Sequence, residues 1–330
     1  MRILFQIRKD YKKNPAGDAV IFNNMVKGLR KLNVSVDVYN DHRISVKKYD
    51  VVHIFNTIRV YESYKFFKNA ENSGKRIVVT PIYWNLRDFY KKSNNMELVR
   101  IWESNESKRK EMLDKCDIIL VHAQRELDEI EKFYGKKTNY KILPYGVDNK
   151  YINGKKNYLS NKYNIDNYIL CVGRIHKQKN QISLLEALKK ETIPIVIAGD
   201  INDKEYLKTC LKIRNKNVFI LNDKSKYELP SLYKSAKVHV LPSFFEYPGL
   251  ASMEAGLAGC NVVTTQIGTT KEIFKDYAKY CNPYDVNSIK ENIMEAFWEE
   301  RDSKLREDIY ENNNWEKICL KLKNIYRSLI

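Results

Sequence analysis

Short apolar runs alternate with amphipathic stretches along the whole chain. Largely apolar runs at 2–7, 51–55 and 117–123 predict β-strands. Residues 18–32, after the first of these runs, carry apolar side chains at the spacing of an α-helix. Because the strand runs hardly alternate with polar residues, they suit parallel strands that are buried on both faces of a sheet.

The strands fall into two series, separated by a polar segment at 151–167 that is rich in Asn and typical of a linker. The first series comprises 2–7, 34–39, 51–55, 76–83 and 117–123 and is closed by 142–148. The second comprises 168–175, 193–200, 217–221, 238–243 and 261–266. Further helices are expected near 60–72 and, as one long polar helix, near 97–114. We therefore expect an α/β fold of two Rossmann-like, doubly wound domains, 1–150 and 151–313, facing each other across a cleft.

The charge of the chain favours anionic partners. The net charge is +17, and residues 1–150 hold 30 Lys and Arg against 19 Asp and Glu, a surplus of +11. This surplus suggests an anionic ligand and a peripheral association with the inner face of a membrane, although a well-solvated surface explains it almost as well. The basic residues are scattered and no nucleic-acid-binding motif is present, so we expect no nucleic-acid partner.

The cysteines and the apolar runs indicate a cytoplasmic protein. Six widely spaced cysteines contain no Cys-x-x-Cys pair, which favours buried thiols in a reducing compartment. No signal peptide is expected at the N-terminus, and no run reaches the roughly 20 apolar residues that span a bilayer.

Polar and glycine-rich clusters follow several strands of the second series, where open α/β sheets bind their ligands. After the strand at 168–172 come Gly173, Arg174, Lys177 and Lys179, just before a predicted helix at 181–190. Cations beside a helix N-terminus form a diphosphate receptor, although a basic surface turn is the alternative. Asp200 and Asn222 follow the next two strands, where backbone groups could hold a nucleobase.

The stretch FFEYPGLASMEAG at 244–256 holds two glutamates eight positions apart. Pro248 and Gly249 would end a loop and start a helix over 250–259 whose first N–H groups point at a ligand. Glu246 lies in the loop, and Glu254 lies among apolar residues of the helix. An ionised carboxylate can only accept hydrogen bonds, so paired sugar or ribose hydroxyls would suit Glu254. Stabilisation by the helix dipole could explain Glu254 alone, but not both glutamates and the glycine.

The segment LPSFFEYPGLASMEAGLAGCNVVTTQIGTTKEIF resembles the C-terminal signature of the retaining GT-B glycosyltransferases of group 1, also called family 4, whose hallmark is Glu-x7-Glu. VGRIHKQKN, IAGD and ILPYGVD extend the resemblance. It implies that Arg174 and Lys179 bind the donor diphosphate and that Glu254 holds the ribose. It also implies that Glu246 and the backbone at Pro248, Gly249 and Leu250 contact the donor sugar and phosphate, and that a final helix at 314–330 crosses back to the first domain.

The first half of the chain departs from this family pattern. The family has a glycine-rich loop after its first strand, where this chain has one glycine, Gly17. Many members have a histidine after the strand that corresponds to 76–80, where this chain has Tyr83 and Trp84. His122, at the end of another strand, is therefore a candidate catalytic residue, although a lone histidine in an apolar strand is more often structural.

The resemblance predicts transfer of a sugar, with retention, from a nucleotide-diphospho-sugar to a glycan or lipid-linked hydroxyl in the synthesis of cell-surface polysaccharide or glycolipid. UDP and GDP are the favoured donor nucleotides, and no further cofactor is expected. The chain has no Asp-x-Asp pair, which fits a metal-independent site. Three alternatives stay open: a nucleotide-sugar epimerase of the same fold, a basic nucleic-acid-binding protein, and a degenerate transferase kept as a binding scaffold.

Overall fold

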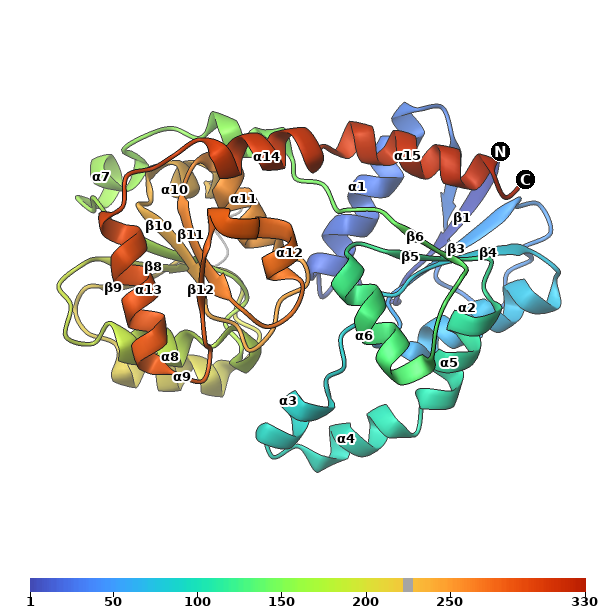
Figure 1. The fold of residues 1–330 in the computed structure, drawn as a ribbon, viewed down its shortest axis with the longest axis horizontal. Helices are drawn as coiled ribbons and strands as arrows, with labels where there is room; N and C mark the ends of the chain where they lie inside the picture. Colours follow the sequence, from blue (N-terminus) through green and yellow to red (C-terminus); the bar gives the residue numbers. More distant parts are fainter. Residues whose placement is uncertain (222–227) are drawn as a thin grey trace. The chain divides into compact units, whose positions relative to one another are not determined.

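The computed structural model describes residues 1–221 and 228–330, and the chain forms two compact units (Figure 1). Unit 1 comprises Met1–Gly146 and Trp315–Ile330, and unit 2 comprises Val147–Asn314. Each unit contains a six-stranded parallel sheet covered by helices. The predicted α/β fold of two Rossmann-like units is thus confirmed.

The sheet of unit 1 has the order β2-β1-β3-β4-β5-β6, and all its neighbouring strands are parallel. Its strands are β1 (Arg2–Gln6), β2 (Ser35–Val38), β3 (Val51–Phe55), β4 (Arg76–Thr80), β5 (Ile118–Val121) and β6 (Tyr140–Ile142). Its helices are α1 (Gly17–Lys31), α2 (Val60–Asn72), α3 (Arg87–Lys92), α4 (Met96–Glu103), α5 (Glu106–Lys115), α6 (Gln124–Tyr134) and α15 (Trp315–Arg327). Figure 1 shows α1 and α15 packed together on one face and α2 and α5 packed together on the other.

The sheet of unit 2 has the order β12-β11-β10-β7-β8-β9. Its strands are β7 (Ile169–Val172), β8 (Ile195–Ala198), β9 (Val218–Leu221), β10 (Val238–Leu241), β11 (Asn261–Thr265) and β12 (Lys279–Cys281). Its α-helices are α7 (Tyr158–Tyr163), α8 (Gln181–Ala187), α9 (Lys204–Ile213), α10 (Leu229–Ser235), α11 (Leu250–Ala258), α12 (Thr270–Phe274), α13 (Val286–Trp298) and α14 (Lys304–Asn312), and its 3₁₀ helices are η1 (Asn149–Asn153), η2 (Lys177–Lys179) and η4 (Lys275–Tyr277).

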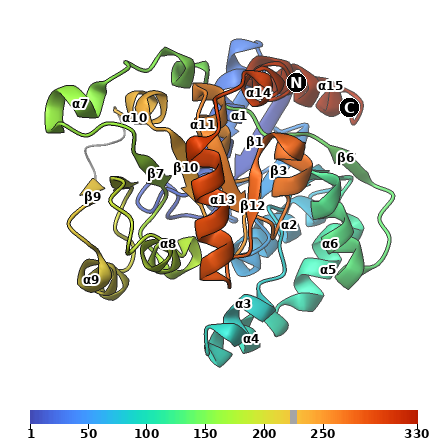
Figure 2. The same cartoon turned by 60° about the vertical axis from the view of Figure 1, so that its left-hand side comes forward.

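Two apolar cores enclose the sheet of unit 2, one on each face. One core is built from side chains of α10, α11 and α14, and the other from side chains of α8, α9 and α13. Figure 2 shows α13 and α9 on either side of α8, as their contacts require. The strands β7, β8 and β10 are buried along their whole length because both faces of the sheet are covered.

The C-terminal helix α15 belongs to unit 1 and completes its core. Cys319 packs so closely against α1 that a Cβ atom added to Gly28 would lie 2.3 Å from its sulfur. The hydroxyl of Tyr326 lies 2.6 Å from Nδ1 of His53 on β3, and both side chains are fully buried. Burial lowers the pKa of His53 to about 3, so this histidine is neutral.

The single helix expected near 97–114 was wrong, because the chain breaks there into α4 and α5. The side chain of Asn105 donates a hydrogen bond to the carbonyl oxygen of Ile101, and the N–H of Arg109 bonds to the carbonyl of Asn105. A short polar side chain that bonds to the backbone in this way competes with the regular helix, so one helix ends and the next begins here.

In the described part of the chain, no helix combines the length and the apolar character that a bilayer span needs.

Candidate active site

The loop after β10 presents Glu246 and is held by the turn that follows β11. The N–H of Glu246 donates to the carbonyl of Ile267, and its own carbonyl accepts from the N–H of Thr269. Gly268 lies between these two partners with φ +113°, and a Cβ atom there would lie 1.9 Å from the carbonyl oxygen of Glu246. Only a glycine fits this approach, so Gly268 fixes the backbone that carries Glu246.

The Glu246 carboxylate forms an ion pair with the ammonium group of Lys179. Lys179 lies in η2, directly after β7, and β7 is the neighbour of β10 in the sheet. The exposed fractions of the two side chains are only 16% and 7%. The sequence therefore predicted both residues, and the structure brings them together at the carboxyl ends of adjacent strands.

Asn180 ties the loops after β7, β10 and β12 together. Its side-chain N–H donates to the carbonyl oxygens of Pro242 (3.1 Å) and Pro283 (2.8 Å), and its own backbone is left-handed with φ +56°. Gln181 is held in the same way, since its side chain donates to the carbonyl of Arg174 at 2.9 Å. Sequence reasoning missed these two amides, because an Asn-Gln pair at the start of a helix carries no distinctive signal.

Gly173 and Arg174 follow β7, and both are half-buried. Gly199, at the end of β8, approaches Gly173 so closely that a Cβ atom at position 199 would lie 2.1 Å from the Gly173 carbonyl oxygen. Asp200 is exposed, and its carbonyl accepts from the N–H of Ile175 at 2.9 Å. Asn222, the third predicted residue of this group, lies outside the described residues.

The N-terminus of α11 lies directly after the Glu246 loop. Pro248 follows a cis peptide bond, and Gly249 is left-handed with φ +76°. No side chain of the described residues caps this helix, which begins at Leu250. Its first N–H groups therefore keep their hydrogen-bonding capacity and the positive end of the helix dipole beside the Lys179–Glu246 pair. This arrangement can receive a negatively charged ligand.

Glu254 lies one turn further along α11 and is surrounded by tyrosines. The hydroxyl of Tyr233 donates to Oε2 of Glu254 at 2.9 Å, and Tyr151 also hydrogen-bonds to this carboxylate. Burial raises the pKa of Glu254 to about 7, although the two tyrosine hydroxyls act in the opposite direction. The residue as a whole is only half-buried. No pattern in the sequence marks Tyr151 and Tyr233, which come from η1 and α10.

The predicted residues of unit 1 do not form a comparable cluster. His122 is buried, its Nδ1 lies 2.6 Å from Oε2 of Glu126, and its ring stacks on that of Tyr145. Tyr83 is also fully buried, and its hydroxyl lies 3.3 Å from that of Tyr134. These enclosed positions favour structural roles for both residues. Their parts in the reaction stay predictions.

Gly17 and Trp84 are the more accessible of the predicted residues of unit 1. Gly17 is exposed at the start of α1, and Trp84 is half-buried. The neighbour of Gly17, Asp18, forms a buried ion pair with Arg8.

Among the described residues, no group of three or more His, Cys, Asp or Glu side chains could hold a metal ion.

The C-terminal unit matches a known family. Residues 156–315 match the model of glycosyl transferases group 1. This segment belongs to the group 1 glycosyltransferases. The chain is 32% identical to an uncharacterized glycosyltransferase of Methanocaldococcus jannaschii over 48% of its own length and 44% of the relative. It is 27% identical to the O-antigen chain mannosyltransferase B of Escherichia coli, over 49% and 46% of the two chains. The aligned part thus spans less than half of either relative.

Solved structures share the fold of this chain over its whole length. Sucrose-phosphate synthase from Thermosynechococcus elongatus gives a TM-score of 0.83 at 16% identity, with 100% of this chain and 99% of that chain covered. HepE of Anabaena, solved in complex with UDP and glucose, gives a TM-score of 0.80 at 14% identity, with 99% and 100% covered. At such low identities the likeness concerns the fold, which is the predicted GT-B class.

Proposed function

We propose that this protein transfers a sugar from a nucleoside-diphosphate sugar to a hydroxyl group of a glycan or lipid-linked acceptor, with retention and without a metal ion. The observation that carries the proposal is the Lys179–Glu246 pair beside the uncapped N-terminus of α11, in a segment of the group 1 family. The O-antigen mannosyltransferase among the relatives supports a role in polysaccharide or glycolipid synthesis.

In this proposal, Arg174, Lys179 and the first N–H groups of α11 bind the donor diphosphate. Negative charge develops on the diphosphate as the glycosidic bond breaks, and fixed positive groups stabilise that charge in the transition state. The anomeric carbon meanwhile gains oxocarbenium character. The acceptor hydroxyl would attack from the face that the diphosphate leaves, and the diphosphate would take its proton.

Glu254 would accept hydrogen bonds from the ribose hydroxyls of the donor. Its ionised carboxylate has acceptor capacity beyond the hydrogen bonds from Tyr151 and Tyr233. Glu246, oriented by Lys179 and Gly268, would contact the donor sugar. Of the residues predicted for the acceptor, Gly17 and Trp84 are accessible, whereas Tyr83 is fully buried. A cytoplasmic location at the membrane surface stays a prediction from the charge of the chain.

Calorimetry with UDP, GDP, ADP, CDP and TDP in the absence of metal ions tests the donor site. We expect one nucleotide to bind selectively, with UDP favoured by the UDP complex of HepE. Binding should be lost in Glu254→Ala and kept in Glu205→Ala, which removes an exposed carboxylate from α9. Binding that ignored Glu254 would contradict the proposed role of this residue.

Product analysis then tests the reaction. With the matching nucleotide sugar, we expect release of the nucleotide to depend on an acceptor, and NMR of the product should show the anomeric configuration of the donor. Conversion of the donor without any acceptor would instead favour the epimerase. Binding without turnover would favour a degenerate transferase.

A further inference from the structure

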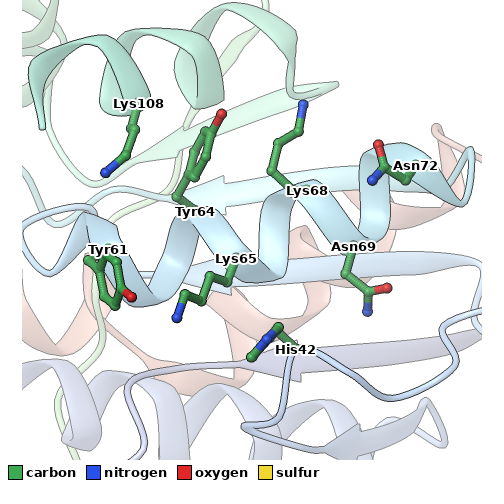
Figure 3. Close-up of a pocket in the computed structure, with 8 residues that line it drawn as sticks. All are labelled: His42, Tyr61, Tyr64, Lys65, Lys68, Asn69, Asn72 and Lys108. Atoms are coloured by element: carbon green, nitrogen blue, oxygen red, sulfur yellow. The ribbon is translucent and has the colours of Figure 1, made fainter.

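Unit 1 contains an open pocket that the proposed reaction does not use. It has a volume of about 400 Å³ and is lined by α2, the loop after β2 and Lys108 of α5 (Figure 3). This volume lies within the usual range for small-molecule sites. The residues proposed to bind the donor all belong to unit 2, so the pocket can be tested separately from them.

An exposed tyrosine ring lies close to two ammonium groups at this pocket. Tyr61 is 60% exposed, the Nζ atom of Lys65 lies 4.2 Å from the centre of its ring, and that of Lys108 lies 5.6 Å from it. Figure 3 shows both lysine side chains ending beside this ring. The two lysines hold the pKa of Tyr61 below its ordinary value, with the hydrogen bond from Lys65 as the largest cause.

Neither Lys65 nor Lys108 has a carboxylate partner among the described residues. Lys108 donates to the side-chain oxygen of Asn105 at 3.2 Å, which leaves its charge uncompensated. The acidic groups of the surroundings already have their own cations. Glu71 and Glu111 pair with Lys68 and Lys115, Glu62 pairs with Arg59, and Asp41 pairs with Arg43. The pocket therefore carries a surplus of positive charge.

The rest of the lining offers neutral polar groups. Asn72 presents a side-chain amide from α2, whereas the amide of Asn69 already donates to the carbonyl of Ile44 at 3.0 Å. Tyr64 is held in place by a 2.6 Å hydrogen bond from its hydroxyl to Glu111. Amides both donate to and accept from hydroxyl groups. An exposed aromatic ring offers a flat apolar surface against which the C–H face of a sugar ring packs.

We propose that this pocket binds an acidic saccharide, with a sugar ring against Tyr61 and its carboxylate or phosphate group between Lys65 and Lys108. An ammonium group attracts such an anion as a point charge, and two of them lie within 6 Å of the centre of the Tyr61 ring. The concave shape and the one exposed tyrosine ring of the lining favour one sugar unit over a flat membrane surface. A polynucleotide would need several stacking rings in a row.

Calorimetry at low salt with the full chain tests this site. The probes are tetragalacturonate and mannose 6-phosphate, with maltotetraose as the neutral control. We expect at least one acidic probe to bind at least tenfold more tightly than maltotetraose. Two changes should each weaken this binding at least tenfold: the double variant Lys65→Ala/Lys108→Ala and the variant Tyr61→Ala. The variant Tyr61→Phe keeps the ring, and its affinity for the probe should stay within twofold of that of the original protein.

The matched control is Lys47→Ala/Lys91→Ala, which removes two exposed lysines of unit 1 outside the pocket. Its affinity for the acidic probe should stay within twofold of that of the original protein. Thermal unfolding of each variant checks that it is folded. Failure of both acidic probes to bind, equal binding of maltotetraose, or binding that survives Tyr61→Ala would overturn the proposal. Tighter binding to phosphatidylglycerol vesicles or to an oligouridylate would overturn it in favour of a membrane or a nucleic acid.

Discussion

Lys179 and Glu246 lie 67 positions apart in the sequence and form one buried ion pair at the ends of neighbouring strands. Each charge depends on the other, because a charge that is buried without a partner is costly. The pair also explains how a lysine in a short 3₁₀ helix can be held in one place. A ligand phosphate at the N-terminus of α11 would then meet an oriented cation.

Lys179→Ala should therefore damage both stability and function. The substitution leaves the Glu246 carboxylate buried without its cation, and we expect a loss of about 3 kcal/mol in the free energy of unfolding. Transfer activity should fall by about two orders of magnitude, as for the loss of one group that stabilises transition-state charge. Urea unfolding and initial rates measure the two effects.

Lys177→Ala is the control for this change, since Lys177 lies on the same 3₁₀ helix and is exposed. It should leave the free energy of unfolding within about 0.5 kcal/mol of the original value. Equal effects of the two substitutions would show that the ion pair contributes nothing specific.

Glu254→Gln should stabilise the protein while weakening nucleotide binding. The folded-state pKa of Glu254 is raised from 4.5 to about 7, so its favourable contribution is complete below pH 4.5 and is lost as the pH rises through 7. At pH 8 the variant avoids the cost of a buried charge, a gain on the order of 2 kcal/mol. The amide of the glutamine can accept only part of the hydrogen bonds that the Glu254 carboxylate would accept from the nucleotide. Denaturant unfolding should show a much larger gain at pH 8 than at pH 5.

Nucleotide affinity should rise with pH across the same range. If only the ionised form of Glu254 binds the ribose hydroxyls, affinity at pH 5.5 should be about thirtyfold lower than at pH 8. The terminal phosphate of the nucleotide titrates near pH 6 as well. The variant Glu254→Gln separates the ionisation of Glu254 from that of the phosphate, because it should retain only the part of the pH dependence that belongs to the phosphate. An identical pH profile in both proteins would remove Glu254 from the explanation.

Gly268→Ala should disturb the Glu246 loop far more than an ordinary glycine substitution. The added methyl group would lie 1.9 Å from the carbonyl oxygen of Glu246, so the loop must move. Gly259→Ala is the control, since φ is +90° there but the added atom meets nothing within 4 Å. The control should lower the free energy of unfolding by about 1–2 kcal/mol, from backbone strain alone, and should keep the nucleotide affinity. Gly268→Ala should cost more and reduce affinity at least tenfold.

The sequence predicted the strands that are buried on both faces, because a continuous apolar run is stable in water only where neighbouring layers cover it. It missed β12, whose three residues Lys279–Cys281 include only one buried side chain. It also joined α4 and α5 into one helix, since the bond from the Asn105 side chain to Ile101 leaves no mark on the hydrophobic pattern.

For the site, the sequence supplied the residues that follow the strands but not their partners. Glu254 was predicted from its polarity within an apolar helix, whereas Tyr151 and Tyr233 come from elements whose packing only the structure shows. His122 illustrates the opposite case. Its position at a strand end suggested chemistry, and its pairing with Glu126 inside the unit could not be read from the chain.

The return of α15 to unit 1 has a consequence for synthesis on the ribosome. Domains that are continuous in sequence can fold as soon as they emerge. Unit 1 cannot, because the partner of His53 is Tyr326 and the surface of α1 at Gly28 is covered by Cys319. Part of the apolar core of unit 1 therefore stays uncovered while the 168 residues of unit 2 are made. During that interval a chaperone, or unit 2 folding first, would protect the nascent chain from aggregation.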